Sequence, residues 1–545
     1  MLKFSSFRKI GARPAKVITG LAVISALLTC LRVQAQATGN GQAGSAADRG
    51  RILLVLPFDN ETGQPGLEWI REAAPSLLSS RLASAGFAPM SRADRLYALD
   101  HLGLPEGFEP SRATALKLAQ TLDADSIIVG SYKTEGKDIV AEAQVVDVPH
   151  LRMSQPITSR GAMNSLIAVF DSLAWEVTRQ LDPNFTGSEE TFVAAGKNMR
   201  LDAFEQYIRG ITEPDQAERL RHLKKAVELS PDLSRAWMAL GREDYNDQQY
   251  EEAAAAFAKV ARNSADSLEA GFYRGLSLLF SGSYPKAEEA FAGVAQVLPL
   301  AEVLNNQGVA LSRQGKDGSA LFRKAVSADP SAPDYHFNLA LSLKRKGDAA
   351  EALQEMGECL KLRAHDSEAQ GLLAVWKASR PTDANTQSDP LERIVRTFDA
   401  SAFRQAAVMM DQMETERLAA LSAPERAKQL AGQAKDYLNR GLLLEAERMY
   451  QLAVAADGSV AAAHVGLAEV RERTGDAAGA RKEAQAALAL GPSVEAHLVL
   501  CRLDLAGNRL EDAGREADEA LKLDPENMVA RELKQQIDRK ASKTQ

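Results

Sequence analysis

The residue types that most often do chemistry are few in this chain, and they lack catalytic spacing. Seven histidines occur in 545 residues, and none belongs to an H-E-x-x-H pattern, which would place two zinc ligands on one helix face. No G-x-x-x-x-G-K-[ST] phosphate loop and no G-x-S-x-G nucleophile turn occurs. The motifs therefore predict a protein that is not an enzyme, with an active site assembled from distant residues as the alternative.

One short loop carries carboxylates at a position where ligands often bind. Asp59-Asn60-Glu61 follows an apolar run, and strand ends of open α/β sheets commonly face ligands. The competing interpretation is turn chemistry, in which Asp59 and Asn60 bond local backbone groups. No second acidic or histidine cluster at metal spacing lies nearby, so we favour the turn and expect no metal and no cofactor.

The three cysteines are too few and too scattered for a disulfide framework. Cys359 and Cys501 fall at small-residue positions of helical patterns, where we expect buried, unpaired thiols. Three histidines, His336, His464 and His497, occupy positions of a large side chain in helical patterns. We therefore expect them to pack rather than to catalyse.

The amino-terminal segment has the layout of an export signal. Residues 1–36 hold six basic and no acidic side chains, and an apolar run of 15 residues, Val17 to Leu31, follows the basic cluster. A membrane-spanning helix needs about 20 residues, so cleavage is favoured over an uncleaved anchor. We predict a signal peptide over 1–37 and a flexible spacer over 38–50. A lipoprotein is disfavoured because Thr29 precedes Cys30 where a smaller residue is usual.

Export implies a periplasmic or envelope-associated protein, with membrane contact only through the signal if it is retained. Loss of the six basic residues changes the formal net charge from −8 to about −14. Binding to phosphate backbones requires the opposite sign, so nucleic acid is not an expected partner.

Residues 51–183 show mixed strand and helix patterns. An apolar run from Arg51 to Phe58 predicts a buried strand, and breakers follow it. Further strands are expected over 87–91, 126–133, 138–148 and, as an option, 151–160, with helices over 67–85, 111–122 and 165–181. This order indicates an α/β sandwich.

Three segments of this region resemble the amino-terminal domain of the TolB translocation protein and its relatives. They are residues 56–63 with Glu68-Trp69, residues 124–131 and residues 143–147. The resemblance implies an assembly module that occurs beside repeats or propellers. It brings no catalytic residues.

The second half of the chain repeats with a period of 33 or 34 residues. The intervals Gly241 to Gly275, Ala253 to Ala287 and Phe257 to Phe291 are each 34 residues. This recurrence resembles the tetratricopeptide family, in which pairs of amphipathic helices stack into a solenoid. Gly241 is expected to let one helix of a pair approach Ala253 on the other.

The repeats predict two blocks. The first covers 200–378, a linker covers 379–390, and helices without repeat markers lead from Leu391 into a second block that ends near 540. One repeat is two residues short between Gly308 and Pro330, and we expect the turn between its helices to be tightened. The predicted fold class is therefore α+β overall: a small TolB-like α/β domain followed by an all-α solenoid.

The family resemblance implies a concave groove lined by the first helix of each repeat. Carried over by register, the candidate partner-binding residues are Arg235, Met238, Arg242, Tyr245, Phe272, Leu276, Asn305, Arg313, Lys344 and Arg345, with Asn246, Leu279, Phe280 and Val309 beside them. Apolar side chains flanked by guanidinium groups would suit an extended or helical peptide with an acidic end. Asn306 and Asn338 resemble the carboxylate-binding subgroup, although Asn is common there in plain repeats. Solvated or packing roles stay open for each residue.

Together these patterns predict a non-catalytic exported scaffold that binds protein or peptide partners during assembly of bacterial envelope complexes. Acidic partners are among those expected. One alternative places ligand or partner recognition in the α/β domain, with the repeats as a spacer or dimeriser. The other is an enzyme of unrecognised type. The sequence leaves the oligomeric state open.

Overall fold

The computed structural model describes residues 52–378 and 390–544. The predicted signal peptide and spacer, and all of the predicted linker except Pro390, lie outside the described residues. The described chain forms two compact units. The described residues of unit 1 are 244–258, 268–378 and 390–405, and those of unit 2 are 52–243, 259–267 and 406–544. The predicted domain boundaries themselves stay a prediction.

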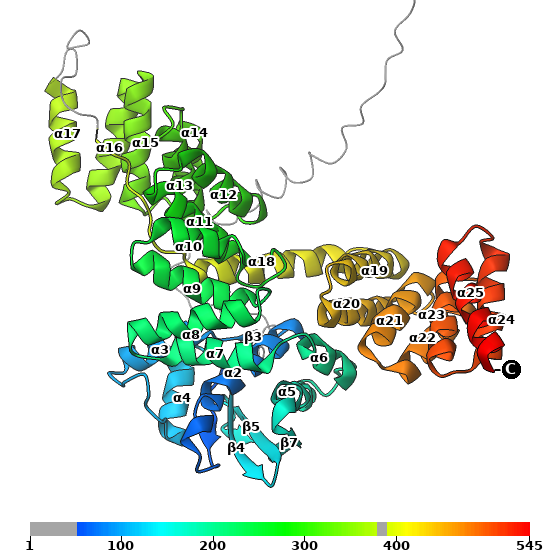
Figure 1. The fold of residues 1–545 in the computed structure, drawn as a ribbon. Coiled ribbons are helices and arrows are strands. Elements are labelled where there is room, and N and C mark those ends of the chain that lie inside the picture. Colours follow the sequence, from blue (N-terminus) through cyan, green and yellow to red (C-terminus); the bar gives the residue numbers. More distant parts are fainter. Residues whose placement is uncertain (1–51, 379–389, 545) are drawn as a thin grey trace, which may run out of the picture. The chain divides into compact units, whose positions relative to one another are not determined.

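Unit 2 begins with a mixed β-sheet (Figure 1). Its strands are β1 (Ile52–Val55), β2 (Asp59–Asn60), β3 (Ala88–Pro89), β4 (Ser126–Glu135), β5 (Asp138–Asp147), β6 (Arg152–Met153) and β7 (Ile157–Ala162). The order is β3-β1-β4-β5-β6, with β2 beside β4 and β7 beside β5. β1 is parallel to β3 and β4, whereas β5 is antiparallel to β4, β6 and β7.

Helices cover both faces of this sheet, because successive strand residues point to opposite sides. Leu53 and Val55 of β1 pack in one core with α2 (Ile70–Ser84) and α5 (Leu166–Leu181). Leu54 packs in a second core with α3 (Arg92–His101) and α4 (Arg112–Thr121). Two short 3-10 helices, η1 (Pro65–Leu67) and η2 (Met163–Ser165), precede α2 and α5. The α/β sandwich is therefore confirmed, and α3 is a helix that the sequence patterns missed.

Three helices follow the sheet, and the first two of them share its core. They are α6 (Glu189–Gly196), α7 (Leu201–Thr212) and α8 (Gln216–Leu229). Phe192 of α6 and Phe204 and Ile208 of α7 are buried among the residues of α2 and α5. The α/β domain, α6 and α7 are consequently packed around one core.

Helices in succession continue the chain to residue 378. They are α9 (Ser234–Asn246), α10 (Tyr250–Phe257), α11 (Ser267–Phe280), α12 (Tyr284–Val297), α13 (Ala301–Ser312), α14 (Ser319–Ala328), α15 (Pro333–Lys346), α16 (Ala349–Leu362) and α17 (Ser367–Ala378). From α12 to α17 each helix packs against the next. Their apolar faces form the core of unit 1, which includes Phe291, Phe322 and Phe337.

The short repeat departs from the expectation of a tightened turn. Residues 313–318 separate α13 from α14, whereas only two residues separate α15 from α16. The shortening lies in the helix instead, because α14 has 10 residues where α12 and α16 each have 14. The turn prediction was wrong: Phe322 is the fourth residue of α14, whereas the equivalent Phe291 is the eighth of α12, so α14 lacks a first turn and the connection before it is longer.

The helix predicted from Leu391 begins only at Ala400. Residues 390–399 form neither helix nor strand and bend at Thr397, and α18 (Ala400–Ala419) follows. The remaining helices are α19 (Ala423–Asn439), α20 (Leu443–Ala456), α21 (Ala461–Thr474), α22 (Ala477–Leu490), α23 (Val494–Ala506), α24 (Leu510–Leu523) and α25 (Met528–Thr544). Each packs against its neighbour, as stacked repeats require.

The later helices of unit 2 contact α6, far away in sequence. Glu447 of α20 is 1% exposed, and both its carboxylate oxygens accept the main-chain N–H of Ser188 at 3.3 Å. The guanidinium of Arg471 lies 3.4 Å from the same carboxylate. This contact joins the second repeat block to the α/β domain.

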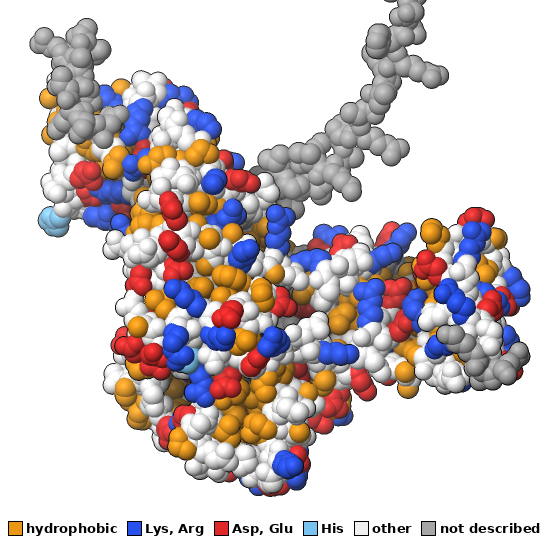
Figure 2. Space-filling model, viewed as in Figure 1, with side chains coloured by type: hydrophobic (Ala, Val, Ile, Leu, Met, Phe, Trp, Pro, Cys, Tyr) orange, Lys and Arg blue, Asp and Glu red, His pale blue; other side chains and the backbone are white. Residues whose placement is uncertain are grey.

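Three further properties of the described residues concern surface charge, membrane-spanning helices and the cysteines. On the face in Figure 2, basic and acidic side chains are interspersed over the described residues. No helix within 52–378 and 390–544 combines the length and apolar character needed to cross a membrane. Cys359 and Cys501 are fully buried and unpaired, as the sequence predicts.

Candidate functional site

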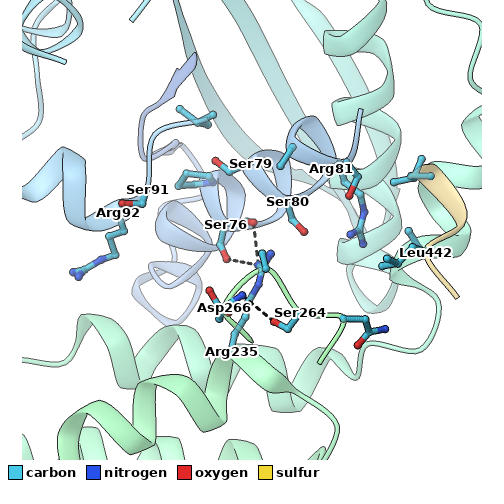
Figure 3. Close-up of a pocket in the computed structure, with 18 of the residues that line it drawn as sticks. Ser76, Ser79, Ser80, Arg81, Ser91, Arg92, Arg235, Ser264, Asp266 and Leu442 are labelled. Carbon is cyan, nitrogen blue, oxygen red and sulfur yellow. Dashed lines mark hydrogen bonds between the residues drawn. The ribbon is translucent and has the colours of Figure 1, made fainter. Parts of the chain in front are cut away.

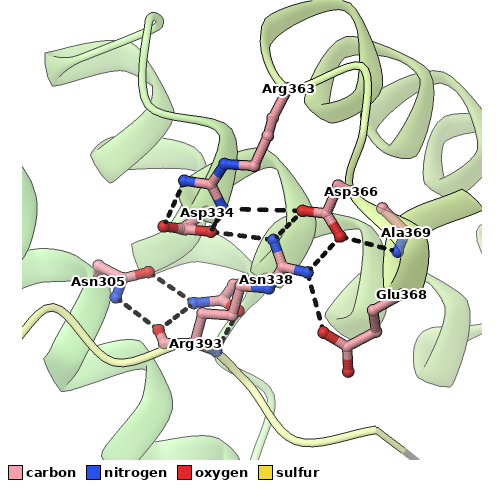
Figure 4. A network of polar contacts seen from close by, with 8 residues as sticks. All are labelled: Asn305, Asp334, Asn338, Arg363, Asp366, Glu368, Ala369 and Arg393. Atoms are coloured by element: carbon pink, nitrogen blue, oxygen red, sulfur yellow. Dashed lines mark hydrogen bonds and ion pairs between the residues drawn. The ribbon is translucent and has the colours of Figure 1, made fainter.

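An extended stretch of the chain lies against the helices of unit 1. Residues 390–399, hereafter the resident segment, bond to side chains of α13, α15 and α17 (Figure 4). They also pack on an aromatic side chain of α11. These helices are the first members of successive pairs. The resident segment therefore occupies the position that the family resemblance assigns to a bound peptide.

Asparagine side chains hold the main chain of the resident segment. The amide of Asn338 accepts from Arg393 N and donates to Arg393 O, each at 2.7 Å. The amide of Asn306 does the same at Val395, accepting from N at 3.0 Å and donating to O at 2.7 Å. Asn305 adds a donor to Arg393 O at 3.1 Å. These bonds resemble the main-chain pairing of β-strands, and they do not depend on the side chains of the resident segment.

The three asparagines are fully buried and bond to one another. Asn338 donates to Asn305 at 2.8 Å, and Asn305 donates to Asn306 at 3.1 Å. The 33-residue interval from Asn305 to Asn338 places equivalent side chains on α13 and α15. Buried amides need partners, because an unsatisfied one costs about 1–3 kcal/mol. The main chain of the resident segment supplies them.

A basic pocket holds the carboxylate of Glu392. Arg313 Nε lies 3.1 Å from this carboxylate, Ser312 donates to it at 2.5 Å, and Arg345 also donates to it. Burial acts to raise the pKa of Glu392, but the hydrogen bonds from Ser312 and Arg345 outweigh it, so the pKa lies below its ordinary value. Arg345 further donates to Pro390 O at 2.9 Å. The site can recognise an acidic side chain on an extended peptide.

An acidic pocket holds the side chain of Arg393, the residue after Glu392. The guanidinium of Arg393 contacts Asp366 at 2.5 Å, Glu368 at 2.9 Å and Asp334 at 3.0 Å (Figure 4). It also lies 3.7 Å from the ring centroid of Phe337. Adjacent residues of the resident segment thus enter pockets of opposite charge. Reversal of either charge would place like charges together, so the pair fixes the register of the peptide.

Apolar and aromatic contacts complete the binding of the resident segment. Ile394 and Phe398 pack on the core of unit 1, and the Phe398 ring lies 5.6 Å from the Phe272 ring. The Arg396 guanidinium lies 5.2 Å from the Phe280 ring centroid. These contacts extend the groove toward α11.

The structure brings together some of the ten candidate partner-binding residues. Asn305, Arg313 and Arg345 bond to the resident segment, and Phe272 contacts it through Phe398. Lys344 lies 5.7 Å from the Trp376 ring centroid, and Tyr245 belongs to an aromatic cluster with Tyr273 and Phe280. Whether any of them binds a separate partner stays a prediction.

Other candidates lie elsewhere in the fold. Met238 and Leu276 are buried core residues, at 5% and 0% exposure. Arg242 is exposed on α9. Arg235 belongs to unit 2, where it donates to Ser76 of the α/β domain. Register alone cannot separate a groove position from a core position when neighbouring repeats differ.

Sequence reasoning missed the residues that hold Arg393 and the resident segment itself. Asp366 and Glu368 lie at the start of α17, and Asp334 at the start of α15. Acidic residues at helix starts are usual for helix-dipole reasons, so they give no specific signal. The alternation Glu392-Arg393 before two β-branched residues is a weak extended-strand signal that could have been noticed.

Unit 2 contains a pocket of about 700 Å³ beside α2 (Figure 3). Its lining includes Ser76, Ser79 and Ser80 of α2, Arg92 of α3 and Arg235 of α9. Arg235 donates to Ser76 Oγ at 3.1 Å and to Ser76 O at 3.2 Å. Arg92 Nε lies 3.5 Å from Glu72 Oε1 in an ion pair, and within the part of the chain that the structure describes it makes no hydrogen bond.

The loop at Asp59 follows the turn interpretation at Asn60. The Asn60 side chain accepts from Thr62 N at 3.0 Å and donates to Glu68 at 2.9 Å. Asp59 and Asn60 also form β2, which pairs with β4. Across the described ranges 52–378 and 390–544, no three His, Cys, Asp or Glu side chains are grouped as metal ligands.

Comparisons with known proteins concern the repeats. The tetratricopeptide repeat model matches residues 238–302, 305–367 and 432–495. The crystal structure of YrrB, described as a TPR protein with an unusual peptide-binding site, is 17% identical, with a TM-score of 0.30, and covers 33% of this chain and 95% of its own.

Crystal structures of MamA are also similar to parts of this chain. One MamA structure is 17% identical, with a TM-score of 0.28, covering 30% of this chain and 96% of its own. MamA from Desulfovibrio magneticus RS-1 is 22% identical, with a TM-score of 0.27, covering 33% of this chain and 100% of its own. No curated protein matches the chain. Residues 238–302, 305–367 and 432–495 are tetratricopeptide repeats, in a mostly helical solenoid with a small amino-terminal α/β region.

Proposed function

We propose that this chain is a non-catalytic scaffold that binds extended peptide segments of partner proteins in the groove of unit 1. Tetratricopeptide repeats generally mediate protein–protein interactions. The observation that carries the proposal is the pairing of Asn306 and Asn338 with both main-chain groups of Val395 and Arg393. Such pairing accepts any extended backbone, and the charged pockets beside it select side chains.

The charges of the groove define which peptides it accepts. The Arg313 and Arg345 pocket holds the carboxylate of Glu392, which supports an acidic side chain at this position of a partner. The Asp334, Asp366 and Glu368 pocket takes a cation. The proposed partner segment is therefore acidic at one position and basic at the next.

The test is selection from a displayed library of ten-residue peptides. The bait is the full chain with Glu392→Ala and Arg393→Ala, hereafter the opened variant, which removes the charged anchors of the resident segment and leaves every groove residue in place. We expect selected peptides to lose binding when Asn306→Ala and Asn338→Ala are added. The matched control is Asn439→Ala, an exposed asparagine of α19. Selection of no peptide, or binding that survives loss of the two asparagines, would exclude the groove as the binding site.

The cellular setting follows from the sequence. The basic and apolar segment over 1–37 supports export to the periplasm or envelope, and the TolB-like segments within 51–183 support a role in envelope assembly. Cell fractionation of the whole chain and of a version that lacks 1–37 tests this. Equal distribution of the two versions between fractions would refute export by this segment.

A second candidate function is recognition of a small anion by the pocket in unit 2. The guanidinium groups of Arg92 and Arg235, which line the pocket together with the serine hydroxyls of α2, favour it. Thermal shift measurements with inorganic phosphate and citrate test it on wild type and Arg92→Gln. A stabilisation by either anion that disappears in Arg92→Gln supports the pocket, and an equal response of both proteins contradicts it.

A further inference from the structure

The resident segment has the properties of a docked ligand rather than of a core element. Glu392 is the one buried residue within 390–399, whereas Leu391 is 63% exposed. Its contacts are hydrogen bonds, ion pairs and ring contacts from side chains of α11, α13, α15 and α17, and it forms no strand of a sheet. Neutral hydrogen bonds contribute about 1 kcal/mol each, so a segment held in this way can exchange with a competitor.

While the resident segment is bound, the hydrogen-bonding and charged groups of the groove are already occupied. The amides of Asn306 and Asn338 are saturated by Val395 and Arg393. The cationic pocket of Arg313 and Arg345 is filled by one carboxylate. A second peptide cannot use these groups at the same time. Binding of any external peptide to this groove therefore requires that the resident segment leave.

We infer that residues 390–399 are an intramolecular ligand that inhibits the peptide groove of unit 1, and that external partners displace it with a segment of the same chemistry. This inference rests on the proposed function. The partner segment is extended and places a carboxylate, then a cation, then two apolar side chains in register, as Glu392, Arg393, Ile394 and Val395 do. A partner with this chemistry satisfies every group that the departing resident segment leaves.

Covalent attachment gives the resident segment a large advantage over a free peptide. A short tether produces an effective concentration on the order of 1 mM, so a free peptide of equal intrinsic affinity competes poorly. Removal of the anchors of the resident segment removes this competition. The affinity of the groove for an added peptide should then rise by about 10- to 100-fold.

The experiment measures binding of a fluorescent peptide with the sequence of residues 390–399 to the full chain. The peptide should bind the opened variant at least about 10-fold more tightly than wild type. A peptide with Gln at the position of Glu392, and another with Gln at the position of Arg393, should each bind the opened variant about 10-fold more weakly, since each loses a charge-assisted contact.

The outcomes separate this inference from the proposed function. Equal affinity for wild type and the opened variant overturns inhibition but leaves the groove as a peptide site. Binding to neither protein overturns the assigned ligand chemistry, while the library selection still decides the proposed function. Binding to the opened variant that persists after Asn306→Ala and Asn338→Ala overturns the assigned site.

A second measurement uses wild type alone and so does not depend on the folding of a variant. Hydrogen exchange of the Arg393 and Val395 amides reports whether the resident segment is docked, because both amides donate to groove asparagines. Excess unlabelled peptide should accelerate their exchange at least about 10-fold if it displaces the segment. Unchanged exchange at a saturating peptide concentration contradicts displacement.

Discussion

At the scale of single residues, a ring nitrogen recurs at the same place in several repeats. The indole N–H of Trp237 donates to Pro231 O at 2.8 Å, and the imidazole Nε2 of His336 and of His464 each lie 3.1 Å from the carbonyl oxygen six residues earlier. Trp and His are therefore interchangeable here because both offer a ring N–H. The sequence-based explanation by packing alone was incomplete.

The second imidazole nitrogen gives these histidines an additional partner. Nδ1 of His336, His464 and His497 lies 2.7 Å from a glutamate 19 residues later, on the second helix of the pair. In His336 both nitrogens face oxygen acceptors, so both must donate, which is possible only in the protonated form. The hydrogen bond to Glu355 raises the pKa of His336 despite its burial.

The raised pKa of His336 predicts how stability depends on pH. Its contribution is fully present below the ordinary pKa of 6.5 and is lost as the pH rises through the raised value in the folded chain. His336→Phe should therefore destabilise unit 1 by about 2 kcal/mol at pH 6 and by less at pH 9.

Thermal unfolding of wild type and His336→Phe over this pH range measures the difference. The control is His365→Phe, because His365 is exposed. A difference between wild type and His336→Phe that does not shrink with rising pH would contradict a protonated His336.

At the scale of elements, glycines in the first helix of a pair allow close contact with an aromatic side chain of the second. A Cβ added at Gly308 would lie 2.7 Å from the Phe322 ring, and one added at Gly275 would lie 2.7 Å from the Phe291 ring. The sequence predicts that Gly241, one period before Gly275, lets its helix approach Ala253, and this stays a prediction. At Gly275 and Gly308 the residue in contact is an aromatic ring, so the ring and the glycine must be considered together.

A matched pair of substitutions tests this packing. Gly308→Ala should destabilise unit 1 by about 1–3 kcal/mol, because the added methyl group overlaps the Phe322 ring. Gly357→Ala in α16 meets open space and should stabilise by about 0.5–1 kcal/mol through helix propensity. Chemical denaturation of the two variants gives the comparison. The packing explanation fails if both substitutions change stability in the same direction.

The resident segment should detach in acid. Glu392 has a lowered pKa, so its ionised form stabilises docking above the ordinary value of 4.5, and this stabilisation is lost as the pH falls through the lowered value. Protection of the Arg393 and Val395 amides should therefore exceed that in Glu392→Gln at pH 7, and the two proteins should converge in acid.

Comparison at each pH cancels the intrinsic pH dependence of hydrogen exchange. Glu526→Gln serves as the control, since Glu526 is 84% exposed and lies in unit 2. A constant difference between wild type and Glu392→Gln from pH 7 to pH 3 would contradict the role of the carboxylate.

At the scale of the whole molecule, contacts between remote parts of the sequence decide how unit 2 is built. The buried carboxylate of Glu447 receives Ser188 N from across 259 residues, and Gln451 donates to Thr186 O at 2.9 Å. Within the α/β domain, Arg81 and Asp171 form a buried ion pair at 2.8 Å, with side-chain exposures of 6% and 0%. The contacts of Glu447 and Asp171 satisfy carboxylates that are buried, at 1% and 0% exposure.

Loss of Glu447 should loosen the contact of the second repeat block with α6. Glu447→Ala leaves Ser188 N without its acceptor and Arg471 with fewer carboxylate partners, at a cost of about 2 kcal/mol. Hydrogen exchange at Ser188 should accelerate, whereas the exposed-site control Glu519→Ala should leave it unchanged. Unaltered protection at Ser188 in Glu447→Ala would show that other contacts hold the block.

The sequence by itself determined the parts of the fold that depend on local periodicity. The 34-residue intervals identified the repeats, because stacked helix pairs must bury the same positions each time, and the apolar run at 51–58 identified β1 because a buried strand is apolar on both faces. Asn305, Arg313 and Arg345 could be named in advance since register carries from one repeat to the next.

Only the tertiary structure decided which segments meet. The docking of 390–399 in the groove depends on Asn306, Asn338 and Asp366, whose partners lie up to 89 residues away. The position of Arg235 beside Ser76 and the approach of α20 to α6 likewise join distant residues. Such contacts follow from complementary charge and unsatisfied backbone groups, which carry no periodic signal in the sequence. The positions of Asn305, Arg313 and Arg345 were therefore predictable, whereas the segment of the chain that they bind was not.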